Sequence, residues 1–327
     1  MKKIMTLLLA MSMLLASGCK GGGDNETVTD LGDGVVLAVG DKEMTADEFQ
    51  FFLDDIKNQM EGTELSAEDG WESEIEGKKA IEIAKERAYE SAVAYLTHIV
   101  IAEKLGLSYS KEEMKELKGQ INTEYFEKYK NGDDLIELIC EASLYTSQLQ
   151  DKLVAEDPID DAKKEKFFQE HKEELAETYL RAKHVLILTQ DEETQTPFDD
   201  AKKAEKKTIA DGILKRAQSG EDFDALVSEY SEDPGSKTNP DGYVFTSGEM
   251  VPEFENCVRS LGMDEIGFTE TSYGYHIIKR LDLDAKSTDN QIINGYYSEK
   301  FVEFIEKYAT EFGIEPVRND EEYNKIK

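Results

Sequence analysis

The chain contains few of the residues that bind metals or form cross-links, with three cysteines and four histidines among 327 residues. No two cysteines stand in a CxxC pair and the histidines lie far apart, so the sequence lacks the ligand spacing of a zinc site. Cys140 and Cys257 fall in segments that we expect to form different domains, and the sequence leaves open whether they form a disulfide. We expect neither a metal nor another cofactor.

Basic residues are also scarce, because 38 lysines and arginines stand against 71 aspartates and glutamates, giving a formal net charge of -33. Such an acidic protein repels the phosphates of nucleic acid and the head groups of anionic lipids. The charge therefore argues against nucleic acid as a partner and against membrane attachment through basic patches. Solubility alone explains the acidity most simply, and electrostatic steering of basic unfolded chains is the alternative.

The apolar run near the N-terminus, residues 4–15, is too short to span a bilayer comfortably as a permanent helix. It follows Lys2 and Lys3 and precedes the small residues of 16–18, which is the pattern of a secretion signal. Removing residues 1–18 removes these two lysines and changes the formal net charge from -33 to -35.

Cys19 directly follows these small residues, and the segment resembles a bacterial lipobox, in which the cysteine thiol is acylated. The segment departs from that pattern at Ala16, where leucine is commoner, and the alternative is an ordinary cysteine near a signal-peptidase site. The resemblance implies a lipid anchor on the extracytoplasmic face of the cell membrane. Residues 19–34 are rich in glycine and poor in apolar side chains, which is typical of a flexible tether.

About 300 residues beyond the signal exceed one typical hydrophobic core, so we expect two domains. The first, residues 35–177, is predicted to be mostly helical after a strand at 35–39. Thr45 and Glu48 form a capping box that begins a helix. This strand, turn and helix resemble the start of the N-terminal chaperone domain in SurA-like and PrsA-like foldases. Further helices are predicted over 78–105, 110–130, 135–153 and 160–177.

The pattern then changes to strands alternating with helices over 179–281, which indicates an α+β domain of about 100 residues. The predicted strands are 179–188, 243–245 and 275–281, and the predicted helices are 198–218, 223–230 and 252–261. A final helix, 290–312, carries an apolar side that one helix cannot bury alone. It either caps the preceding domain or, as we favour, packs back onto the N-terminal helices, so that the α+β domain is an insertion.

Four segments of the α+β region resemble the parvulin family of peptidyl-prolyl cis/trans isomerases in order and spacing. They are Arg181–Leu186, Tyr230–Ser236, Gly248–Phe254 and Tyr273–Lys279. The resemblance implies a small antiparallel sheet surrounded by helices. Two departures concern the pocket region: the family's usual Gly-Gly-Asp-Leu-Gly run is replaced by Pro240–Tyr243, and residues 266–273 are about one residue short and lack a proline.

The resemblance implies that His184, Asp233, Thr271 and His276 form the catalytic frame. In the family picture the two histidines lie side by side on neighbouring strands and fix each other's tautomer, with the threonine in the same hydrogen-bond network. A purely structural histidine pair is the alternative, as is a turn-forming role for the aspartate before Pro234. Asp233 would place its charge beside the carbonyl of the rotating amide and ease rotation.

Met250 and Phe254 are the expected proline-binding pair. They stand four residues apart, so on one helix both side chains would face the same pocket. Simple core packing is the alternative. Because all six expected site residues are present despite the two departures, we predict an active isomerase.

The sequence therefore predicts an extracytoplasmic isomerase and foldase that acts on unfolded or partly folded exported polypeptides with X-Pro bonds. The alternative is a holding chaperone whose parvulin-like domain is inactive. A lipid-anchored solute-binding protein would need two similar lobes of alternating strand and helix, which the chain lacks. The oligomeric state is open, a homodimer included. The expected divisions are a signal at 1–18, a tether at 19–34, a helical chaperone-like domain at 35–177, a parvulin domain at 178–284, and a C-terminal segment at 285–327 that packs on the N-terminal domain.

Overall fold

The computed structural model describes residues 31–65 and 70–326. Cys19, the predicted signal and most of the predicted tether lie outside the described residues. The chain divides into two compact units, one made of the residues up to Pro158 together with those from Tyr297 onward, and the other of Ile159–Tyr296. No helix within the described ranges is both long and apolar enough to cross a membrane.

The first unit contains a three-stranded antiparallel sheet with the strand order β2-β1-β9. The central strand β1 (Val35–Val39) is completely buried and confirms the predicted strand. Its neighbours β2 (Lys42–Thr45) and β9 (Pro316–Arg318) were not predicted, because both are short and mostly polar or exposed. Of the three strands, only β1 is apolar on both faces, and this pattern predicts a strand.

Helix α2 (Ala46–Met60) begins at Thr45 as predicted, and its capping box is complete. The Thr45 side chain accepts a hydrogen bond from the Glu48 amide, and the Glu48 carboxylate accepts one from the Thr45 amide at 2.7 Å. Phe49, Phe52, Leu53 and Ile56 of this helix are all buried. The predicted apolar face therefore lies in the core.

The helix predicted over 110–130 is correct at its start and wrong in its length. Helix α4 (Lys111–Lys118) begins with a capping box at Ser110, but it ends at Gly119 and a short 3-10 turn follows at η1 (Thr123–Phe126). Phe126 stacks on Phe51 of α2, with ring centroids 5.5 Å apart. This aromatic contact holds the chain against α2, in an irregular path rather than one continuous helix.

Two long helices complete the packing of this unit, and the last long helix of the chain closes it. The buried residues of α3 (Ala80–Lys104) and α5 (Gly132–Glu156) share one core with Phe301, Phe304, Ile305 and Tyr308 from the second half of α10 (Asp289–Phe312). A two-residue hairpin, β3 (Glu74–Ile75) with β4 (Lys78–Lys79), precedes α3. Helix α11 (Asp320–Lys325) adds Tyr323, whose ring meets Phe49 edge-on at 5.7 Å.

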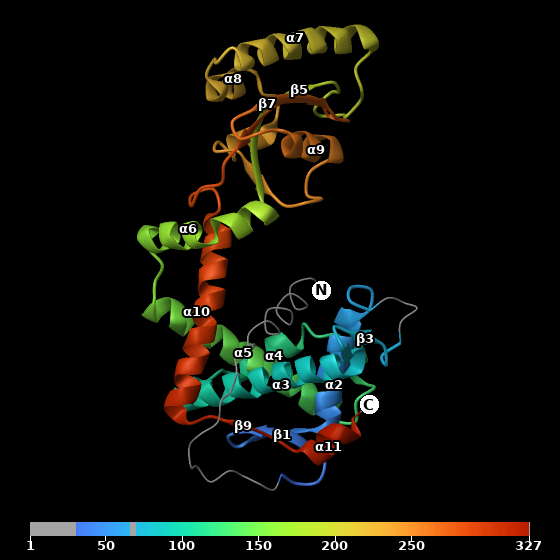
Figure 1. The fold of residues 1–327 in the computed structure, drawn as a ribbon, viewed down its shortest axis with the longest axis vertical. Coiled ribbons are helices and arrows are strands. Elements are labelled where there is room, and N and C mark those ends of the chain that lie inside the picture. The colour runs from blue at the N-terminus through green and yellow to red at the C-terminus, as the bar shows by residue number, and fades with distance from the viewer. Residues whose placement is uncertain (1–30, 66–69, 327) are drawn as a thin grey trace. The chain divides into compact units, whose positions relative to one another are not determined.

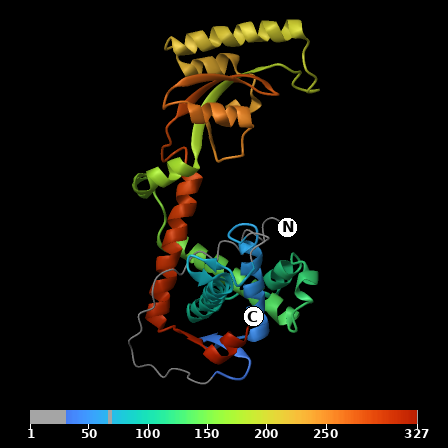
Figure 2. The same ribbon diagram turned by 45° about the vertical axis from the view of Figure 1, so that its right-hand side comes forward.

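The second unit is built on a four-stranded antiparallel sheet with the order β6-β5-β8-β7. Its strands are β5 (Leu180–Leu188), β6 (Tyr243–Phe245), β7 (Ile266–Glu270) and β8 (Gly274–Leu281). Helices α7 (Asp200–Gln218) and α8 (Phe223–Tyr230) cover one face, and α9 (Pro252–Ser260) covers the other, as both views show (Figures 1 and 2). Helix α6 (Asp161–Thr178) also belongs to this unit, where Phe167 packs against Tyr296.

Strand β7 corrects the predicted three-stranded pattern. It was missed because none of its five residues is buried and because Gly267 stands in its middle. The glycine leaves room for its neighbours, since a Cβ atom at this position would lie 2.9 Å from a methyl carbon of Leu261 and 3.1 Å from the Cys257 sulfur. The strand thus lets α9 approach the sheet closely.

Cys257 and Cys140 are both free thiols.

The two faces of this sheet pack against different helices. Val185 and Ile187 of β5 pack under α7 and α8, whereas Ala182 and Ile278 pack with Phe254 and other residues of the α9 side. Because side chains alternate along a strand, the residues that share the second face with Ala182 point toward α9. His184 is one of these, so the sheet directs it to the α9 side.

Candidate active site

Two buried imidazoles lie next to each other on the central strands of the second unit. His184 of β5 pairs with Ile278 of β8, and His276 of β8 pairs with Leu186 of β5, so the histidines are diagonal neighbours on one face. Their ring centroids are 5.1 Å apart with the planes at 85°. The register of β5 and β8 confirms the predicted placement of the two histidines on neighbouring strands.

Each imidazole is held by its own partner rather than by the other histidine. His184 Nε2 lies 3.0 Å from Asp233 Oδ2, and His276 Nε2 lies 2.9 Å from Thr271 Oγ1. Both Nδ1 atoms are buried and have no hydrogen-bond partner among the described residues. The expectation that the two rings fix each other's tautomer is therefore wrong, because each Nε2 atom is fixed by a separate side chain.

The hydrogen-bond partner of His184 assigns a proton of that ring. A carboxylate only accepts hydrogen bonds, so His184 carries a hydrogen on Nε2. The Thr271 hydroxyl accepts a hydrogen bond from the Tyr273 amide at 3.1 Å and also lies within hydrogen-bond distance of His276 Nε2. Burial, together with the neighbouring His184, lowers the pKa of His276 to about 3, so this ring is neutral at physiological pH.

Asp233 combines a turn-forming role with a place in the site. It begins the 3-10 turn η2 (Pro234–Lys237), where its Oδ1 accepts a hydrogen bond from the Gly235 amide at 3.0 Å. Its Oδ2 accepts from the hydroxyl groups of Tyr243 at 2.6 Å and Ser236 at 3.0 Å, in addition to His184. Burial raises the pKa of this carboxyl, but the hydrogen bonds from His184 and Tyr243 outweigh it and hold the pKa well below its usual range. The group is therefore ionised at physiological pH.

Tyr243 is a site residue that sequence reasoning missed. Its ring stacks on His184 with centroids 5.6 Å apart and planes at 23°, and burial together with the bond to Asp233 raises the pKa of its hydroxyl. The close approach depends on Gly235, where a Cβ atom would stand 2.2 Å from the Tyr243 oxygen. The available signal was the departure from the family pattern at Pro240–Tyr243, which brings a new donor to the aspartate.

The second departure from the family pattern, the shorter segment at 266–273, leaves the geometry of the site intact. Strand β7 pairs with β8 without a bulge, from Ile266 opposite Lys279 to Glu270 opposite Tyr275. Thr271 follows directly and stays within hydrogen-bond distance of His276. The shorter segment therefore places the threonine where the resemblance expects it.

Phe254 lies edge-on to both imidazoles, at 5.1 Å from His184 and 5.5 Å from His276, and is buried. Met250 lies beside it but not on the same helix, because α9 begins only at Pro252. The prediction of two helical neighbours is wrong for Met250, since the proline sets the first turn of the helix two residues later. Both side chains nevertheless line one pocket of about 430 Å³.

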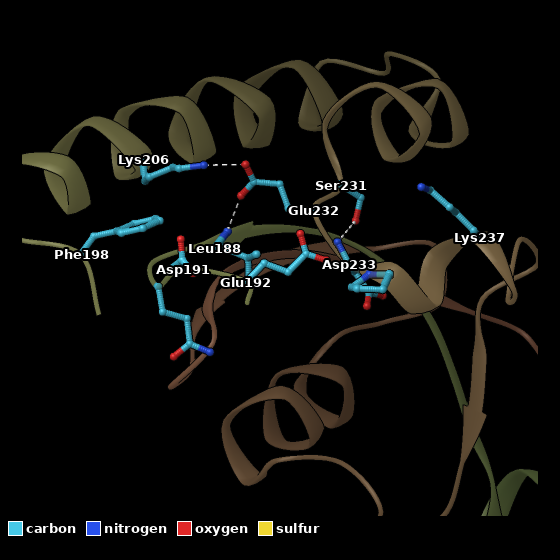
Figure 3. A pocket seen from close by; sticks show the side chains of 11 residues that line it. Leu188, Asp191, Glu192, Phe198, Lys206, Ser231, Glu232, Asp233 and Lys237 are labelled. Carbon is cyan, nitrogen blue, oxygen red and sulfur yellow. Dashed lines mark hydrogen bonds and ion pairs between the residues drawn. The ribbon is translucent and has the colours of Figure 1, made fainter. Parts of the chain in front are cut away.

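This cavity, which we call the proline pocket, brings together five of the six predicted residues: His184, Asp233, Met250, Phe254 and His276. Thr271 stands behind His276 and does not line it. A second pocket of about 360 Å³ adjoins it and shares Leu188, Gln190, Glu192, Asp233 and Pro234. Figure 3 shows this adjoining pocket, with Lys206 bonded to the Glu232 carboxylate, which also accepts from the Leu188 amide.

An antiparallel sheet with two histidines, an ionised aspartate and an apolar pocket beside them defines a parvulin-type isomerase domain. Residues 166–283 match the protein family described as the PPIC-type PPIASE domain. Over 295 residues the chain is 31% identical to the foldase protein PrsA of Caldanaerobacter subterraneus subsp. tengcongensis, covering 88% of this chain and 86% of the relative. The chain belongs to the PrsA foldase family.

Two further comparisons cover a smaller share of this chain. The chain is 38% identical over 122 residues to the foldase protein PrsA of Halalkalibacterium halodurans, covering 37% of this chain and 31% of the relative. The crystal structure of PrsA from Bacillus subtilis is 21% identical, covers 73% of this chain and 92% of that one, and superposes with a TM-score of 0.30. Family membership rests on the first relative, which spans most of both chains.

The family and the isomerase domain together establish the function. The protein is an extracytoplasmic foldase with peptidyl-prolyl isomerase activity, and its substrates are unfolded proteins. The predicted α+β class is confirmed. The alternative of a holding chaperone with an inactive domain is not favoured, because the isomerase family match spans the whole site and the site residues keep their contacts.

Proposed function

We propose that the proline pocket catalyses rotation of X-Pro bonds in unfolded or partly folded exported polypeptides. One observation carries the assignment: a single pocket of about 430 Å³ joins an apolar pair, Met250 and Phe254, to the ionised Asp233 and two imidazoles. A pocket of this size suits a proline ring with its neighbouring peptide groups. No cofactor is part of this proposal.

Rotation of an X-Pro amide crosses a barrier of roughly 18 to 20 kcal/mol, set by amide resonance, and no covalent bond is made or broken. The protein therefore needs no strong nucleophile. It needs an apolar surface that holds the ring and a polar frame that favours the twisted amide over both planar forms. Phe254 and Met250 supply the apolar surface in this proposal.

Asp233, His184 and His276 supply the polar frame. The permanent charge of Asp233 disfavours the resonance form in which the substrate carbonyl oxygen is negative, and so eases rotation. His184 keeps its Nε2 hydrogen on Asp233, while its Nδ1 has no hydrogen-bond partner among the described residues. Thr271 orients His276 from behind and acts as a positioning residue.

The test is the cis-to-trans rate of a short Ala-Pro peptide with the full chain and with Phe254→Ala. Truncating a buried aromatic costs roughly 3 to 5 kcal/mol where the ring is fully enclosed and less in an open pocket, so we expect kcat/KM to fall at least about tenfold. Phe268→Ala is the matched control, because Phe268 packs on the opposite face of the same sheet. A folded wild-type chain that does not accelerate isomerisation would overturn the proposal.

We further propose that Cys19 carries the lipid that holds the protein on the extracytoplasmic face of the cell membrane. The sequence around Cys19 supports this, and the acidic surface gives no alternative attachment. The proposed domain roles are isomerisation in the domain predicted at 178–284 and client holding in the helical domain predicted at 35–177, which 285–327 completes. The compact units divide the chain after Pro158 and before Tyr297 instead, so α6 lies in the isomerase unit. A homodimer remains a prediction that sedimentation of the chain without residues 1–18 can test.

A further inference from the structure

The proline pocket carries more negative charge than its catalytic aspartate. Glu192, from the segment between β5 and α7, and Glu249, from the turn before α9, both line it and are exposed to solvent. Among the residues that the structure describes, no lysine or arginine lines this pocket. Apart from the imidazoles, the ionisable side chains with an ordinary charge at neutral pH that a peptide meets in this pocket are therefore acidic.

Neither of these two glutamates has a lysine or arginine partner among the described residues, whereas the nearby Glu232 is paired with Lys206. Asp233 is also charged, but hydrogen bonds from His184, Tyr243, Ser236 and Gly235 hold its two oxygens in place. Glu249 accepts a hydrogen bond from the Thr246 amide at 2.6 Å, which leaves its charge in place. Glu192 makes no hydrogen bond or ion pair with any residue that the structure describes. Both charges are therefore available to a bound peptide.

The lysines of the adjoining pocket do not offset this charge. Lys206 is engaged with Glu232, their charged atoms 2.5 Å apart. Lys237 lies at the opposite end of that pocket from Phe198, and it does not line the proline pocket (Figure 3). The acidic character is thus local to the place where the proline would bind.

An exposed aromatic ring at the same pocket points to the same kind of ligand. Tyr273 lines the proline pocket and is 46% exposed, which is unusual for so large a side chain in this unit. The face of an aromatic ring attracts an ammonium or guanidinium group. Two uncompensated carboxylates and an exposed ring together form surroundings suited to a basic side chain.

We propose that the enzyme prefers X-Pro segments in which a residue adjacent to the proline is lysine or arginine, and that Glu192 and Glu249 determine this preference. The inference rests on the isomerase function proposed above. Acidic neighbours of the proline are disfavoured by the same charges. The substrate class is therefore basic, proline-containing stretches of unfolded polypeptides.

The experiment compares kcat/KM of the full chain on two peptide series, with lysine, alanine or glutamate either before or after the proline. We expect lysine to exceed glutamate about fivefold or more in at least one series, since each exposed ion pair contributes a few-fold at most. The double variant Glu192→Gln/Glu249→Gln should reduce this ratio to about twofold or less. The side-chain carbonyl introduced at position 249 can still accept a hydrogen bond from the Thr246 amide, so the turn is kept.

Glu193→Gln and Glu253→Gln are the matched controls, because they remove the same charge from neighbouring positions that do not line the pocket. They should leave the lysine-to-glutamate ratio unchanged. Equal rates for lysine and glutamate peptides in both series would overturn the inference, as would an equal loss of preference in the control variants. Even with either of these results, faster isomerisation of the alanine peptides would still support the isomerase function.

Discussion

Four hydrogen-bond donors surround the two oxygens of Asp233, and this is the unusual feature of the site at the scale of single residues. One of them, the hydroxyl of Tyr243, is brought in by a segment that differs from the family pattern. Such a carboxylate is rigid as well as ionised, because every donor fixes its direction. In the mechanism that we propose, its charge acts on the rotating amide without reorganisation.

Asp233→Ala should therefore lower kcat about tenfold or more with little change in KM, since the charge is felt mainly as the amide twists. Tyr243→Phe should have a smaller effect in the same direction, because three donors remain. Tyr179→Phe, outside the site, is the control for loss of a tyrosine hydroxyl. A rise in KM with an unchanged kcat in Asp233→Ala would show that the carboxylate binds the ground state instead.

His98 gives the first unit a pH dependence of its own. It is fully buried, its Nδ1 lies 2.9 Å from Thr146 Oγ1, and its ring meets Phe301 edge-on at 5.3 Å. Burial lowers its pKa to about 4, below its value of about 6.5 in the unfolded chain. The folded state then binds fewer protons than the unfolded state between these two values, so stability is present above pH 6.5 and is lost as the pH falls toward 4.

We expect the free energy of unfolding of this unit to drop by roughly 2 to 3 kcal/mol between pH 7 and pH 4.5 from this residue. His276 adds a loss of the same sign in the second unit, because its pKa is lowered to about 3. Urea unfolding at several pH values, with wild type and His98→Gln, measures the effect. An equally steep acid dependence in His98→Gln would assign the loss to other groups.

At the scale of elements, sequence patterns predicted those pieces whose identity is set locally. The capping boxes of α2 and α4 begin both helices where Thr45 and Ser110 indicated. The completely buried β1 and the long strand β5 were likewise visible as apolar runs. Each of these depends on residues within a few positions of one another.

The missed elements depend on contacts between distant parts of the chain. Strand β9 forms by pairing with β1. Strand β7 forms by pairing with β8, and its Gly267 leaves room for α9 to approach the sheet closely. For the same reason, the motifs named His184, Asp233 and His276 but could not show Tyr243 beside them. That contact requires β6 to pair with β5, and Gly242 allows the pairing, since a Cβ atom there would lie 2.8 Å from the Ala182 carbonyl oxygen.

At the scale of the whole molecule, the proposed attachment to the membrane through Cys19 is separate from folding and catalysis. We expect Cys19→Ala to release the protein into the soluble fraction or to block its processing, because the two or three acyl chains of a bacterial lipoprotein give the stable anchor that one chain does not. Fractionation of cells followed by detection of the chain measures this. Unchanged membrane retention after normal signal removal would contradict the lipid assignment, and unchanged isomerase activity is expected in either case.

The first unit is assembled from both ends of the chain, and this affects how the protein folds during its own synthesis and export. A polypeptide emerges from its N-terminus, so residues 31–158 reach the outside before Phe301, Phe304 and β9 exist there. Until those last residues arrive, the edge of β1 has no partner on one side and the helical core lacks part of its apolar filling. The isomerase unit, by contrast, is continuous in sequence and complete before the chain ends. All residues of the isomerase unit of this foldase are therefore outside before the first unit can close.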